Sequence, residues 1–162
     1  MRHQGTTLLE LLFVLAILAV MLLIAAPNYQ RLLIQQQLSS SAQQMLASLN
    51  YARHLAVTQG GAYVCDGEQG CDDFQRPNAI EIFVSAPDGS LNSHQWQPFH
   101  PEISVQWRRF RGNHLYFNSQ GRSVFSNGHF LLCHARHYGT AYKVVLNWSG
   151  RARIERTDAD NC

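Results

Sequence analysis

The sequence contains very little lysine and carries no motif typical of an enzyme. Lysine occurs once, at Lys143, and the other twelve of the thirteen basic residues are arginines. Arginine pairs with phosphate and carboxylate groups through two parallel hydrogen bonds, although a biased codon composition would produce the same preference. Eight histidines are present, but neither a Gly-x-Ser-x-Gly nucleophile motif nor a phosphate-binding glycine loop accompanies them. The sequence therefore predicts neither an enzymatic activity nor a cofactor.

The chain also lacks internal repeats and low-complexity tracts, and its 162 residues allow one domain of ordinary size. An apolar run from Leu8 to Ala26 would span about 28 Å as a helix, close to the hydrocarbon thickness of a bilayer. The remainder, roughly 100 to 130 residues, is long enough for one hydrophobic core.

Two ordinary interpretations of the N-terminus leave features unexplained. A cleaved secretory signal would have a shorter apolar core and a small-x-small cleavage site. A plain transmembrane anchor fits the length of the run, but it explains neither Glu10 nor the short leader Met1–Gly5.

The segment GTTLLELLFVLAILAVMLLIAAPNY, which begins at Gly5, resembles the class III signal of type IV pilins and type II secretion pseudopilins. In these proteins a short basic leader ends in glycine, glutamate follows at the fifth position, and proline interrupts the apolar helix; Gly5, Glu10 and Pro27 match. The resemblance implies that prepilin peptidase cuts between Gly5 and Thr6 and methylates the new amine. The family usually has phenylalanine where this chain has Thr6.

Glu10 has a physical role under this resemblance. In a packed fibre its carboxylate would neutralise the N-terminal ammonium of a neighbouring subunit, where an unpaired charge would be costly. The alternative is a carboxylate that reaches the lipid headgroups while the protein waits in the membrane.

The segment 28–61 is predicted to form an amphipathic helix that packs on a sheet. Its apolar residues recur at spacings of four and three, and Gly60 and Gly61 are suited to ending the helix. The apolar residues are Leu38, Ala42, Met45, Leu49, Ala52 and Ala56. Pro27 is expected to kink or open the helix rather than end it.

Residues after Gly61 are rich in β-branched and aromatic runs separated by turn signals. The clearest runs are Ala79–Ala86, His114–Asn118, His129–Ala135 and Tyr142–Trp148. A long helix followed by strands predicts an α+β fold, with the helix packed on an antiparallel β-sheet or β-sandwich. The expected parts are a leader 1–5, a transmembrane assembly helix 6–27, the amphipathic helix 28–61 and a β-rich globular domain 62–162.

The charge of this β-rich half is unevenly distributed along the chain. Residues 62–102 carry seven acids against Arg76, whereas residues 103–157 carry nine basic residues against Glu155, a balance of +8. Such asymmetry indicates a polyanionic partner, although a basic face is often only a solvated surface.

Three segments resemble the FimT and GspH group of minor pilins. They are SLNYARHLAVTQGG at the predicted helix end, LYFNSQGRS with Phe117, Gly121 and Arg122, and VVLNWSGRARIER with Gly150, Arg151 and Arg153. In the FimT branch the Gly-Arg-x-Arg element contacts DNA in natural transformation. The resemblance therefore implies a DNA-binding site at Gly150, Arg151 and Arg153.

The residues of this element permit two interpretations. In the first, Arg151 and Arg153 project from one face of a strand and pair with phosphates. Gly150 would let the backbone turn tightly and expose amides to an anion. Arg156 would extend the patch, and Trp148 would stack on a base. The alternative is a solvated edge strand whose charges prevent it from pairing with another chain, with Trp148 in the core. The spacing alone favours the edge strand, and the family motif favours DNA binding.

The four cysteines would face the periplasm, where an even count predicts disulfides. Three pairings are possible, and we favour Cys65 with Cys71 and Cys133 with Cys162. The alternative, a zinc site at Cys133, His134 and His137, lacks a Cys-x-x-C spacing.

The function expected from the sequence is that of a minor type IV pilin that binds double-stranded DNA without sequence preference. Its precursor would lie in the inner membrane with a periplasmic domain and would then join the pilus at the cell surface. The expected partners are double-stranded DNA, other pilins or pseudopilins, prepilin peptidase and the inner membrane. The alternative is a structural, GspH-like minor pseudopilin that initiates or caps a type II secretion pseudopilus or a type IV pilus.

Overall fold

The computed structural model describes residues 8–66, 77, 79–85, 90–109, 114–123, 126–136 and 139–162. The chain forms two compact units, Met1–Gln35 and Gln36–Cys162. One helix, α1 (Leu8–Gln59), contributes to both of them. It contains an 18-residue stretch of mean hydropathy 3.0 whose side chains are not buried, which is long and apolar enough to cross a membrane.

Helix α1 continues through Pro27, as the sequence predicts. A proline in a helix interior removes one backbone hydrogen bond. The side chain of the next residue bonds to the helix here, because Asn28 Nδ2 donates to the carbonyl of Ile24 at 3.1 Å. The helix ends after Gln59, where Gly60 has a φ of +99° and its amide donates to the carbonyl of Ala56 at 3.0 Å. This left-handed glycine is a common helix terminator.

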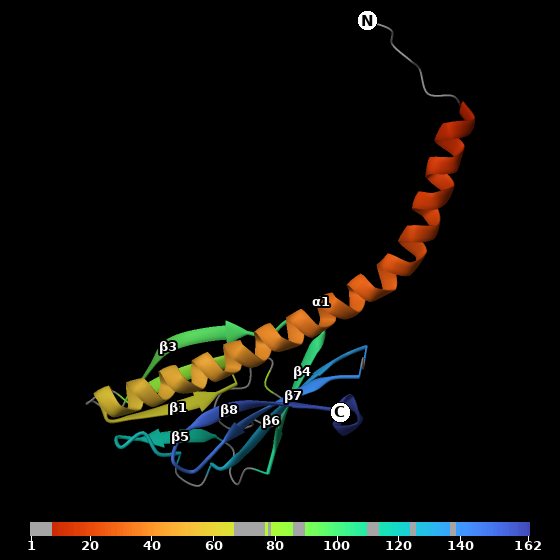
Figure 1. The fold of residues 1–162 in the computed structure, drawn as a ribbon. Helices are drawn as coiled ribbons and strands as arrows, with labels where there is room; N and C mark the ends of the chain where they lie inside the picture. Colours follow the sequence, from red (N-terminus) through yellow and green to blue (C-terminus); the bar gives the residue numbers. More distant parts are fainter. Residues whose placement is uncertain are drawn as a thin grey trace, which may run out of the picture. The chain divides into compact units, whose positions relative to one another are not determined.

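The predicted apolar stripe of α1 is buried along its whole length. Its six residues, Leu38, Ala42, Met45, Leu49, Ala52 and Ala56, are each at most 1% exposed. In the second unit this part of α1 lies beside β3, as Figure 1 shows, and Ser48 Oγ donates to Gln97 Oε1 at 3.2 Å. The helix thus covers a sheet, as its periodicity predicts.

The strands form two four-stranded antiparallel sheets. The first has the order β3-β2-β1-β5 and the second has the order β4-β6-β7-β8, so β8 is an edge strand. The strands of the first sheet are β1 (Gly61–Cys65), β2 (Ala79–Ser85), β3 (Leu91–Pro98) and β5 (Leu115–Asn118). Those of the second are β4 (Ile103–Arg108), β6 (Gly128–His134), β7 (Ala141–Leu146) and β8 (Ala152–Thr157), followed by a short 3-10 helix at Ala159–Asn161.

The second sheet has one face in the core and one outer face. Alternate residues such as Phe130, Leu132 and Val144 are fully buried in the core, together with Phe117 of the first sheet. The architecture is the α+β fold expected from the sequence, a long helix packed on antiparallel sheets.

The outer face of the second sheet is apolar at one end. Leu131, Cys133 and Ala141 form a buried cluster there, and Cys162 of the C-terminal tail packs against it. The tail is attached by the Cys133–Cys162 disulfide, the pairing favoured from the sequence.

Candidate nucleic-acid interface

Two turns of the same sequence pattern, Asn-x-x-Gly-Arg, lie at residues 118–122 and 147–151. In each turn the glycine amide donates to the asparagine carbonyl at 2.8 Å, and the asparagine amide donates to the arginine carbonyl at 3.0 Å. The glycines have φ angles of +69° at Gly121 and +75° at Gly150, a region that favours glycine. The two turns therefore have matching backbone hydrogen bonds and glycine conformations.

The two turns pack directly on each other. A Cβ atom on Gly150 would overlap the carbonyl oxygen of Gly121, which also accepts a hydrogen bond from Arg53 Nε at 3.1 Å. Ser123 joins them further, because its amide donates to the Trp148 carbonyl at 3.1 Å and its Oγ to the Asn147 carbonyl at 2.7 Å. These contacts hold the turn that leads into β8.

Gly150 makes the tight turn expected of it, but it does not offer its amide to an anion. It is buried, and its amide donates to the Asn147 carbonyl inside the turn. The expectation that this amide faces an anion is wrong, because the turn already uses the donor. Gly150 instead permits the close contact with Gly121.

The three arginines after this turn do not share one face. Arg151 and Arg153 are exposed and lie two residues apart, so they project from the same side of the chain. Arg156 lies three residues beyond Arg153, hence on the opposite face of β8, and its Nη2 donates to Thr140 Oγ1 at 3.1 Å. The structure thus brings Arg151 and Arg153 together and leaves Arg156 apart from them.

Arg153 belongs to a row of residues that crosses the whole sheet. The strand register pairs Arg108 with His129, His129 with Val145, and Val145 with Arg153. Residues paired across strands project from the same face of a sheet. We call Arg108, His129, Val145 and Arg153 the basic row; it lies on the outer face, at the end away from the disulfide.

The charges around His129 show how concentrated this basic surface is. Burial is the largest factor that lowers the pKa of His129 below its ordinary value of 6.5, followed by the charges of Lys143, Arg109 and Arg108. The negative charge of Glu155 raises the pKa of His129. Glu155 also binds Arg153, whose Nη2 and Nε lie 2.6 and 2.7 Å from Glu155 Oε1. His129 therefore lies among cations that, together with burial, disfavour its protonation, and one carboxylate partly balances them.

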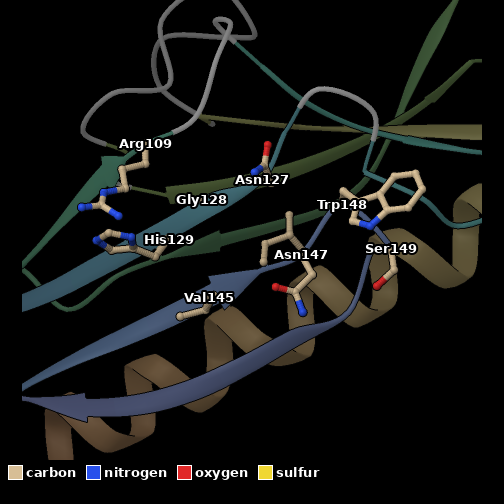
Figure 2. Close-up of a pocket in the computed structure, with 9 residues that line it drawn as sticks. Arg109, Asn127, Gly128, His129, Val145, Asn147, Trp148 and Ser149 are labelled. Carbon is tan, nitrogen blue, oxygen red and sulfur yellow. The ribbon is translucent and has the colours of Figure 1, made fainter.

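A hollow of about 830 Å³ adjoins the basic row. Figure 2 shows Arg109 and His129 at one end, Trp148 at the other, and Asn127 and Asn147 between them. The hollow is lined by Arg109, Asn127, Gly128, His129, Val145, Leu146, Asn147, Trp148 and Ser149.

Trp148 is 67% exposed, so the alternative that placed it in the core is wrong. The guanidinium carbon of Arg122 lies 5.4 Å from the centre of its ring, a cation–π contact. Arg122, the last residue of the first Asn-x-x-Gly-Arg turn, therefore lies beside the Trp148 ring of the second turn.

The remaining predicted sites are described only in part. Cys65 is disulfide-bonded, but its favoured partner Cys71 lies outside the described residues. Cys133 is bonded to Cys162 and so cannot serve as a zinc ligand, and His137 also lies outside the described residues. Within the described part of the chain, no group of three or more histidine, cysteine or acidic residues could hold a metal ion.

The residues of the predicted processing site precede the described helix. Gly5 and Thr6 lie outside the described residues, and Glu10 lies in the first turn of α1. Their roles in cleavage and assembly stay predictions.

Comparison with known proteins identifies the family of this chain. Residues 41–150, more than half of the sequence, match the family described as type II transport protein GspH. The chain belongs to this family. Residues 1–26 match the prokaryotic N-terminal methylation motif. The GspH match ends at Gly150, so it does not include Arg151 and Arg153.

Two crystal structures of the Pseudomonas aeruginosa (strain PAO1) type IV minor pilin FimU have a similar fold. The match to one of them has 21% sequence identity and a TM-score of 0.59, and it covers 75% of this chain and 90% of the FimU chain. The match to the other has 22% sequence identity and a TM-score of 0.57, and it covers 73% of this chain and 92% of the FimU chain. At these identities the likeness shows the fold alone. No curated protein matches the chain.

The GspH-family chain is thus a minor type IV pilin or pseudopilin with an apolar N-terminal helix that fits a membrane anchor. The methylation motif implies other pilins and a prepilin peptidase as its partners.

Proposed function

We propose that this minor pilin binds double-stranded DNA without sequence preference during DNA uptake for natural transformation. The observation that carries the proposal is the basic row, in which Arg108 and Arg153 come from opposite edges of one sheet. Arg151 adds a third exposed guanidinium beside Arg153.

The dimensions of the row suit a phosphate backbone. Three strand spacings separate Arg108 from Arg153, roughly 14 Å in total. That length of duplex axis carries about eight phosphates on its two strands. Arginines bind phosphate oxygens through charge-assisted hydrogen bonds, and such contacts carry no sequence information. The expected binding is therefore electrostatic and tolerant of sequence.

The proposal includes the route by which the protein reaches the fibre. Prepilin peptidase would cut between Gly5 and Thr6 at the inner membrane, with the globular domain in the periplasm. Glu10 would then pair with the new N-terminal ammonium of a neighbouring subunit in the fibre. Mass spectrometry of membranes should find a chain that begins at methylated Thr6. An intact Met1 terminus in cells with active peptidase would contradict this route.

A second function has one observation in its favour. Arg153 already has an ionic partner in Glu155, which lowers its availability to a phosphate. A structural minor pseudopilin that initiates or caps a fibre would not need free arginines on this face.

Binding of the full-length chain in detergent to duplexes of unrelated sequence distinguishes the two functions. We expect similar affinities for all duplexes, because phosphate contacts are sequence-independent. The Arg151→Gln/Arg153→Gln variant should lose affinity by the same factor for every duplex. Arg31→Gln/Arg136→Gln is the matched control, since it removes the same charge from two exposed arginines outside the row. If the first variant binds DNA as well as the parent protein, the structural pseudopilin is the better description.

A further inference from the structure

The hollow beside the basic row combines features that duplex binding does not use. A duplex can meet the row with its phosphates, but the bases in its interior are stacked on both faces and cannot lie against an aromatic ring. Trp148 is nevertheless 67% exposed at one end of the hollow. We infer that this hollow binds an unpaired nucleotide, with its base on Trp148 and a phosphate at Arg109 and His129. This inference rests on the proposed DNA binding and adds a preference for single-stranded ends.

The Trp148 end is built as a stacking platform. Arg122 contacts the ring at 5.4 Å, while the turn that carries Trp148 is fixed by its own glycine and by Ser123. A ring held in this way loses little conformational freedom when a base binds. Stacking on an aromatic side chain tolerates every base, because each base has a π-face. The platform therefore fits DNA of any sequence, as the basic row does.

The middle of the hollow offers polar groups that suit the edge of a base. Asn127 and Asn147 are exposed and line the hollow between its two ends (Figure 2). Each amide side chain can both donate and accept hydrogen bonds, so it can pair with any of the four bases. Val145, half-buried, adds an apolar contact. The volume of about 830 Å³ is within the range of small-ligand sites.

The opposite end is suited to a phosphate. Arg109 and His129 line it together, with Arg108 and Lys143 close enough to act on His129. Arg109 has a φ of +67°, a conformation that non-glycine residues adopt at some energetic cost. Strained residues of this kind gather at binding sites, where the surrounding structure holds them in place.

Fluorescence polarisation with the full-length chain in detergent tests the inference. The probes are a blunt duplex and a shorter duplex with a single-stranded extension, matched in their number of phosphates. We expect the extended probe to bind about tenfold more tightly, because one stacked base adds to the same phosphate contacts. Trp148→Ala should abolish this difference, because the extended probe loses its stacked base, and Trp148→Phe should keep most of it. Thermal melting of each variant monitors its fold.

The outcomes separate this inference from the proposed function. Equal affinity of the parent protein for both probes, or an equal loss for both in Trp148→Ala, overturns the nucleotide site and leaves duplex binding in place. Binding of a nucleoside monophosphate without any gain from the extension also overturns it, in favour of a site for free nucleotides. Absence of binding to every DNA probe removes the proposed function and the inference together.

Discussion

The two ends of the outer face of the second sheet have different surroundings, although the same strands pass through both. At one end Leu131, Cys133 and Ala141 are buried under the C-terminal tail, which the disulfide to Cys162 attaches. At the other end the basic row is partly or fully exposed. Because a strand alternates its side chains between two faces, every second residue belongs to the outer face. The outer face is covered where these residues are apolar and exposed where they are basic. The covered end stabilises the sheet, and the open end is available to a partner.

The two Asn-x-x-Gly-Arg turns extend this comparison. They share their hydrogen bonds, but the first supplies the Gly121 carbonyl on which the second packs, and the second carries Trp148 and leads into β8. The open end therefore depends on a rigid support that lies outside it. Substitutions in the contact between the two turns should therefore lower the free energy of unfolding, whereas substitutions on the open surface should change DNA affinity.

The largest effect is expected from Gly150→Ala, which damages the support. The new Cβ overlaps a backbone carbonyl and forces a residue at φ +75°, so the free energy of unfolding should fall by about 4 kcal/mol. Chemical denaturation measures the change. Gly139→Ala is the matched control, because Gly139 has a φ of +57° but nothing lies within 4 Å of its Cβ position; its cost should be about 1 kcal/mol. Equal losses in the two variants would refute the packed-turn account.

Removal of the disulfide at the covered end should have the next largest effect. The bond closes a separation of 29 residues, and the chain-entropy relation gives a loss of roughly 3.5 kcal/mol for Cys133→Ala/Cys162→Ala. Calorimetry of the variant against the parent protein measures it. Because the basic row lies at the other end, DNA affinity below the melting range should change less than twofold. A large loss of affinity in the folded variant would mean that the two ends are not separable.

At the open end, Glu155→Gln should strengthen DNA binding. It removes the acid that holds Arg153 at 2.6 Å, and one more available cation adds up to one phosphate contact, or about threefold in affinity. Titration with a duplex at fixed salt gives the ratio. Asp158→Asn, which changes the same charge just beyond β8, is the control; the two variants should differ if Arg153 is the group released.

An effect of similar size concerns pH. A phosphate near His129 raises the pKa of its imidazole, so DNA binding takes up a proton and affinity rises as pH falls. Since burial, Lys143, Arg109 and Arg108 lower the pKa of free His129 below 6.5, with Glu155 opposing them, the rise should level off only at a pH below 6.5. It should reach about threefold.

His129→Gln should flatten this dependence, whereas His94→Gln on β3 should leave it intact. Affinities measured from pH 5.5 to 8 test both variants. The same slope in the parent protein and in His129→Gln would exclude His129 from the interface.

Local features of the fold were predictable from the sequence for physical reasons. The buried stripe of α1 follows from a spacing of three and four, and the shared face of Arg151 and Arg153 follows from strand alternation. Strand β3 was not predicted, because LNSHQWQP is polar and ends in proline, as an edge strand can.

The basic row could not be predicted. Arg108, His129 and Arg153 are distant in the sequence, and only the long-range register aligns them. The repeated Asn-x-x-Gly-Arg pattern, by contrast, was present in the sequence and would have indicated two related turns. The separation of Arg156 from Arg153 also followed from strand parity, which the expected arginine patch disregarded.

The salt dependence of duplex binding tests most directly whether the open end contacts phosphates. Each phosphate contact contributes about −0.9 to the slope of log affinity against log salt. The parent protein should show a steep negative slope. Arg151→Gln/Arg153→Gln should flatten it by about one to two, because Glu155 limits the contact that Arg153 makes with a phosphate, and Arg31→Gln/Arg136→Gln should leave it unchanged. The same slope in the parent protein and in Arg151→Gln/Arg153→Gln would contradict the account.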